Sequence, residues 1–128
     1  MTLITTHIKW IMLVSGALTS TMFYAVLAPQ AALMSTFGAS ISGPLAEIVV
    51  RNWGALITLV GAMLIYGAFR PIHRTLVIAV ATISKMVFIV LVLTIGSQYL
   101  GKAGVAIVFD AVVVVLFVAY LASVRRVA

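Results

Sequence analysis

Residues 74–97 read RTLVIAVATISKMVFIVLVLTIGS, and this stretch decides the fold. Beyond Arg74 at its start, it contains one charged residue, Lys85. A helix needs about 20 predominantly apolar residues to cross the hydrocarbon core of a bilayer. Backbone groups inside lipid must be satisfied within the segment, so a run of this length and composition predicts a membrane-spanning helix.

Similar apolar runs extend outward from this stretch in both directions. Short polar turns at 70–74 and 96–102 bound it, and another apolar run lies beyond each turn. A further run lies near the N-terminus and ends before Pro29. The expected structure is one all-α domain, a compact antiparallel bundle of four transmembrane helices. The predicted spans are about 8–28, 48–69, 74–97 and 103–123, with an outer loop at 29–46.

Two details concern the N-terminal third of the chain. The run at 8–28 is longer than the apolar region of a signal peptide, which is about 7–15 residues, so we expect a retained helix. Within the loop, residues 31–37 are apolar enough to form a short helix on the membrane surface.

Composition excludes a soluble domain. Of the 128 residues, 65% are hydrophobic and ten are charged, eight Lys or Arg and two Asp or Glu. Soluble domains are about 45–50% apolar and about one quarter charged. The chain has no cysteine, which excludes disulfides, thiolate metal sites and cysteine nucleophiles.

Lysine and arginine predict the orientation, because cytoplasmic loops carry an excess of these residues. With the N-terminus in the cytoplasm, five would lie on the cytoplasmic side and two outside. The cytoplasmic set is Lys9, Arg70, Arg74, Arg125 and Arg126, and the outer set is Arg51 and Lys102. We therefore expect both termini in the cytoplasm and, in a bacterium, a location in the inner membrane.

The net charge of +6 does not indicate nucleic-acid binding, which needs a dense basic surface with many phosphate contacts. Here the cations are spread over the ends of four predicted helices. The expected partners are membrane lipids, whose anionic head groups attract cations such as Arg70 and Arg74. A partner membrane protein or a homo-oligomer is also compatible with the sequence.

Two charges lie deep within predicted spans. Lys85 lies eleven residues after Arg74, which is roughly 16 Å along a helix at ~1.5 Å per residue. Asp110 lies eight residues after Lys102, or roughly 12 Å. An ionised group at such depth costs about 2.5–3.5 kcal/mol on insertion scales. We expect Lys85 and Asp110 to face inward and to interact.

Further polar residues begin the second predicted span. Glu47 and Arg51 are four residues apart and can pair on one helix face, and Arg51 is a second possible partner for Asp110. We expect a polar cluster that opens toward the outer side. Its members would be Glu47, Arg51, Asn52, Lys85 and Asp110, with Ser84 beside Lys85. Small residues on both predicted helices favour their close approach. On the second span they continue the Arg51 face and are Gly54, Thr58 and Gly61. On the first span they are Ser15, Gly16, Thr19 and Ser20.

Several roles are open for this cluster. Buried polar groups can simply determine helix register and pairing. They can instead hold a lipid head group or a polar ligand, with Arg51 and Lys85 binding an anionic or zwitterionic group. A third possibility is a small proton-coupled transporter, in which Asp110 takes up and releases a proton while Lys85 alternates as its partner.

Enzyme and cofactor templates fit the sequence poorly. The two carboxylates are predicted at different depths, and the two histidines, His7 and His73, belong at the opposite membrane face. A metal site usually needs three or four ligands. We expect no catalytic residue, no metal and no cofactor, although an enzyme acting on lipid is the weakest of the remaining alternatives.

A pattern of short motifs resembles small bacterial four-helix membrane proteins of the DoxX-like group, many of which are domains of unknown function. It comprises Gly43-Pro44-Leu45-Ala46-Glu47, then Arg51-Asn52-Trp53-Gly54-Ala55, then Arg70-Pro71 and Ser84-Lys85. The resemblance covers about residues 25–120. It implies an accessory role in a redox or membrane-associated assembly and no catalytic residue. The lack of cysteine puts a thiol-redox role in doubt. The leading prediction is a non-enzymatic accessory subunit or a bundle that holds a lipid or small ligand.

Overall fold

The structure is a computed structural model that describes residues 2–127. Helices make up nearly all of that range, and no strand occurs within it. The elements are α1 (Thr2–Ser20), η1 (Thr21–Phe23), α2 (Tyr24–Leu27), α3 (Pro29–Phe37), α4 (Pro44–Phe69), η2 (Pro71–His73), α5 (Arg74–Thr94), η3 (Ser97–Tyr99) and α6 (Leu100–Val127). The predicted all-α class is confirmed.

Within residues 2–127, four helical stretches are long and apolar enough to cross a membrane, as predicted. They are Thr6–Leu27, Pro44–Phe69, Pro71–Thr94 and Ser97–Val124. The protein is therefore a multi-pass membrane protein. The second stretch begins at Pro44, earlier than predicted, because Gly43 precedes it with a φ of 109° and proline suits the first helical turn.

Two prolines end helices by restricting the residue before them. Ala28 precedes Pro29 with φ −137° and ψ 74°, and Arg70 precedes Pro71 with φ −128° and ψ 84°. The proline ring disfavours the helical region for the preceding residue, so the chain must turn at both places. The short helix predicted over 31–37 is present as α3, and Ala32 and Leu33 on it are buried against the bundle.

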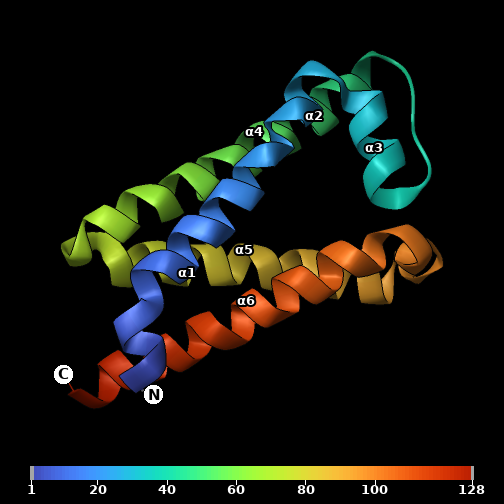
Figure 1. The fold of residues 1–128 in the computed structure, drawn as a ribbon. Helices are drawn as coiled ribbons and strands as arrows, with labels where there is room; N and C mark the ends of the chain where they lie inside the picture. The colour runs from blue at the N-terminus through green and yellow to red at the C-terminus, as the bar shows by residue number, and fades with distance from the viewer. Residues whose placement is uncertain (1, 128) are drawn as a thin grey trace.

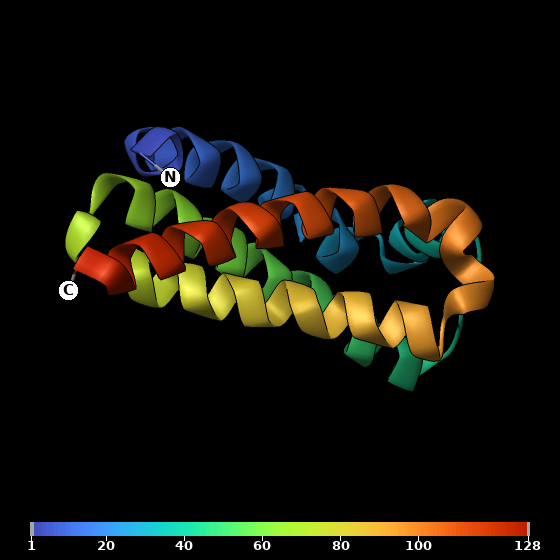
Figure 2. The same ribbon diagram turned by 90° about the horizontal axis from the view of Figure 1, so that it is seen from below.

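The long helices form two antiparallel pairs, α1 with α4 and α5 with α6 (Figure 1). Both termini lie at one end of the bundle, here called the terminal end, together with the turn between α4 and α5 (Figures 1 and 2). The opposite end, here called the far end, holds α3 and the turn between α5 and α6. There α3 extends from the first pair toward α6, and it contacts α2, α4 and α6.

Small residues bring α1 and α4 into close contact, as their spacing predicted. A Cβ atom added to Gly61 would lie 2.7 Å from the carbonyl oxygen of Gly16, and one added to Gly16 would lie 2.8 Å from that of Gly61. The close contact continues into α2, where a Cβ atom on Gly54 would lie 2.7 Å from the Cβ of Ala25. Such backbone proximity maximises van der Waals contact, the main attraction between helices in lipid.

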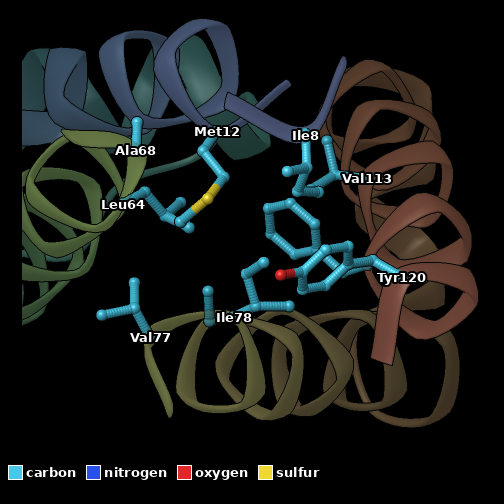
Figure 3. Close-up of a cluster of buried hydrophobic side chains, with 10 residues drawn as sticks. Ile8, Met12, Leu64, Ala68, Val77, Ile78, Val113 and Tyr120 are labelled. Carbon is cyan, nitrogen blue, oxygen red and sulfur yellow. The ribbon is translucent and has the colours of Figure 1, made fainter. Parts of the chain in front are cut away.

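The buried hydrophobic core (Figure 3) lies toward the terminal end, since it includes Ile8 near the start of α1 and Ala68 near the end of α4. A cluster of fully or nearly fully buried side chains joins α1, α4, α5 and α6 there. Its members are Ile8, Met12, Leu64, Ala68, Val77, Ile78, Ala81, Val113, Phe117 and Tyr120. This cluster holds all four spanning helices together and leaves the far end to be organised by other contacts.

Candidate functional site

Lys85 and Asp110 form an ion pair within the bundle. Lys85 Nζ lies 2.8 Å from Asp110 Oδ1 and donates a second hydrogen bond of 3.3 Å to Thr19 Oγ1. The two charged side chains are 7% and 14% exposed. The ammonium also lies 5.1 Å from the centre of the Phe109 ring. The predicted interaction of Lys85 with Asp110 is therefore present, and it connects α1, α5 and α6.

The pair retains some hydrogen-bonding capacity. A lysine ammonium has three donors, and a carboxylate has two acceptor oxygens. Within the described residues, Lys85 uses two donors and Asp110 Oδ2 receives no hydrogen bond. Because mutual neutralisation and hydrogen bonding offset the cost of burial, the pair can remain deep in the bundle and still engage one more polar group.

Glu47 and Arg51 form a second, separate pair at the far end. Arg51 Nη2 lies 3.2 Å from Glu47 Oε1, and Arg51 Nη1 donates to the carbonyl oxygen of Val26. The two side chains are about half exposed, at 44% and 49%. Arg51 thus serves an unsatisfied carbonyl at the end of α2, which is a common use of cations at helix C-termini.

The five residues predicted as one cluster are therefore divided. Two ion pairs account for four of them, and Asn52 is exposed on α4. Within residues 2–127, no hydrogen bond or ion pair joins Arg51 to Asp110. The physical reason is direction, since Arg51 faces α2, where it caps the Val26 carbonyl, whereas Asp110 faces Lys85 on α5.

A cavity of about 710 Å³ lies between the two helix pairs toward the far end. Lys85, Asp110 and Ser84 line it, together with apolar side chains such as Leu56 and Phe88. Glu47, Arg51 and Asn52 are not among its lining residues. Ligand pockets are typically about 300–1,000 Å³ and combine apolar walls with a few polar groups. This cavity has that size and that composition.

Several polar lining residues were not predicted as members of the site. The hydroxyl of Tyr24 is hydrogen-bonded to Ser35 Oγ, which ties α2 to α3 across the far end. Thr36 and Lys102 also line the cavity. From the sequence, Lys102 indicated only the edge of a membrane span. The position of α3, which brings these residues together, depends on tertiary contacts that no local pattern reveals.

An aromatic cluster connects α3 to the rest of the bundle. The Phe37 ring centre lies 6.1 Å from that of Trp53, 6.3 Å from that of Phe88 and 5.8 Å from that of Tyr99. Aromatic pairs at such distances contribute about 0.5–1.5 kcal/mol beyond area burial. Trp53 and Phe88 also line the cavity, so the contacts that secure α3 form part of the cavity wall.

Within the described residues, no three His, Asp or Glu side chains come together in a group able to hold a metal ion. The polar groups of the cavity are instead one ion pair, one further lysine and several hydroxyls. Such groups can bind and orient a polar head. Comparison of the chain with models of known protein families, with curated proteins and with solved structures gives no match.

Proposed function

We propose that this protein is a non-enzymatic, ligand-holding bundle of the cell inner membrane, with both termini in the cytoplasm. Its ligand would be a small amphiphile, a molecule with a polar group and an apolar body. The observation that carries the proposal is the cavity of about 710 Å³, whose walls are mainly apolar and which Lys85 and Asp110 line. The polar group of an amphiphile can bind the polar lining residues, and its apolar body can pack against the apolar ones.

The test is a substitution that fills the cavity with a larger side chain. Ala106 lines it on α6, whereas Ala122 is exposed on the same helix outside it. Purified in a lipid-preserving polymer, the protein should carry a defined small molecule in native mass spectrometry. Ala106→Phe should lose that molecule, and the matched Ala122→Phe should retain it. Equal retention by both variants, or no bound molecule in the unchanged protein, would contradict the proposal.

The same measurement addresses the accessory-subunit role implied by the resemblance to DoxX-like proteins. A stoichiometric protein partner that persists in Ala106→Phe would favour that role, because it would not depend on the cavity.

Orientation can be tested separately, since the chain has no cysteine. Gln98→Cys at the far end should react with an impermeant thiol reagent in intact cells, and Ile72→Cys at the terminal end only after permeabilisation. The reverse pattern would invert the proposed orientation.

A second candidate is a small proton-coupled transporter. The observation that favours it is that both members of the Lys85–Asp110 pair line the cavity. Asp110→Asn keeps an acceptor for Lys85 but cannot ionise. In proteoliposomes it should remain folded and abolish pH-driven uptake of the co-purifying molecule. Unchanged uptake by Asp110→Asn would exclude proton coupling through this residue.

A further inference from the structure

Lys102 stands where the cavity meets the far end. It lies in the first turn of α6 and lines the cavity together with Ser35 and Thr36 of α3. Gly38 ends α3 with a φ of 73°, and a Cβ atom added there would lie 3.0 Å from Lys102 Cγ. The start of the lysine stem therefore lies against the backbone of this turn, and the residue is exposed at the mouth of the cavity.

The charges around the cavity do not balance. Its charged lining residues are Lys85, Asp110 and Lys102. Lys85 and Asp110 neutralise each other, which leaves one positive charge. The chain has two acidic residues, and both are already paired, Asp110 with Lys85 and Glu47 with Arg51. Lys102 is exposed, so this surplus positive charge lies at the mouth of the cavity, where it attracts an anion.

The distance between Lys102 and Asp110 limits the length of a ligand that the cavity can hold. Lys102 and Asp110 are eight residues apart on α6, which is ~12 Å along the helix. One leaflet of the hydrocarbon core is about 15 Å deep, half of the ~30 Å total. Apolar side chains including Leu56, Val87 and Val105 line the cavity as well. A single apolar chain whose head lies at Lys102 fits this distance.

We infer that the cavity holds a single-chain amphiphile with a monoanionic head group, with the head at Lys102 and Thr36 and the chain along the apolar wall that includes Leu56, Val87 and Val105. This inference rests on the proposed ligand-holding function and names the class of ligand. This inference places the head group at a different site from the one predicted from the sequence. The sequence pointed to Arg51 and Lys85, but both of these cations have carboxylate partners of their own.

The chain contains a reporter for the test. It has two tryptophans, and Trp53 lines the cavity. In a Trp10→Phe background, Trp53 fluorescence in phosphatidylcholine nanodiscs should respond to decanoate, and less to decanol or decyltrimethylammonium of equal chain length. We expect decanoate to bind roughly tenfold tighter than the other two, as hydrogen bonds to charged groups suggest. Lys102→Gln should remove this preference, and Arg70→Gln, a matched change at the terminal end, should keep it.

The possible results separate the two proposals. Equal binding of the three probes, unaffected by Lys102→Gln, would overturn the anionic head and leave the ligand-holding function standing. The absence of any Trp53 response, together with no molecule in native mass spectrometry, would overturn both. Displacement of decanoate by phosphatidylglycerol added to the nanodiscs would overturn the single-chain ligand, because a two-chain lipid would then supply the anionic head.

Discussion

The two ends of the bundle are built differently from the same kinds of helix. Toward the terminal end, the four spanning helices share one buried cluster, in which Met12, Leu64 and Phe117 are each 0% exposed. Toward the far end, side chains that face the space between the helix pairs line a cavity instead, and Leu56 and Val105 are part of its wall. The Lys85–Asp110 pair lies at the inner part of this cavity.

The difference shows how a small membrane protein can combine stability with an open site. In lipid, helix association depends on packing and hydrogen bonds and not on escape from water. One well-packed end is enough to hold the helices in position. The other end can then remain hollow, provided that local contacts such as the Phe37 aromatic cluster hold α3 across it.

The largest effect should come from breaking the ion pair at the boundary between the two regions. Asp110→Ala would leave Lys85 buried without a counter-charge, so we expect the free energy of unfolding to fall by about 3–5 kcal/mol. The double variant Lys85→Met with Asp110→Leu should recover most of this loss. Unfolding in detergent, followed by circular dichroism, measures both. A loss below about 1 kcal/mol for Asp110→Ala would mean that water reaches Lys85 freely.

The next prediction compares the two regions directly on one helix. Leu64 and Leu56 both lie on α4, the first in the packed cluster and the second on the cavity wall. Leu64→Ala should lower the free energy of unfolding by about 2–4 kcal/mol, because it leaves an unfilled space in a close-packed cluster. Leu56→Ala removes the same atoms from a site that is already open and should cost much less. Equal losses, measured in the same way, would contradict the contrast between the two ends.

A smaller effect is expected at the contact of α1 with α4. Gly61→Ala would place a methyl group against the Gly16 carbonyl and should cost about 1–3 kcal/mol by overpacking. Gly104 on α6 is the matched control, because a Cβ atom there meets nothing within 4 Å. Gly104→Ala should be neutral or stabilise by up to about 1 kcal/mol through helix propensity. Thermal unfolding should place Gly61→Ala below the unchanged protein and Gly104→Ala at or above it.

The smallest effect should come from the exposed pair at the far end. Glu47→Gln removes the partner of Arg51, but an exposed pair of this kind contributes only about 0–1 kcal/mol. Arg51 retains its bond to the carbonyl oxygen of Val26. We expect a change in the free energy of unfolding within that range and a smaller one at high salt, where the pair is screened. A loss as large as that of Asp110→Ala would show that Glu47 is energetically coupled to the deeper pair.

Much of the fold could be predicted from the sequence because membrane helices obey strong local constraints. The apolar runs, the prolines at 29 and 71 and the small residues at Gly16 and Gly61 each act through the backbone or through helix periodicity. The interaction of Lys85 with Asp110 was predictable for a related reason. Two opposite charges deep in consecutive antiparallel spans are more stable facing each other than facing lipid.

The rest of the site was not predictable because it depends on separations between helices. Nothing local indicates that the two helix pairs enclose a cavity, or that α3 brings Ser35 and Thr36 near Lys102. The sequence placed Arg51 and Asn52 with the deeper charges because all of them belong to the same half of the membrane. Shared depth does not imply contact, since each helix face points in one direction only.

The sequence by itself determined the number of spanning helices, their approximate ends and the pairing of Lys85 with Asp110. The physical reason is that lipid penalises every unsatisfied backbone group and every unpaired charge, so local composition leaves few choices. Only the tertiary structure decided that one end is filled and the other hollow. That outcome depends on how closely side chains from four helices fit together, and close packing is a property of the assembled bundle.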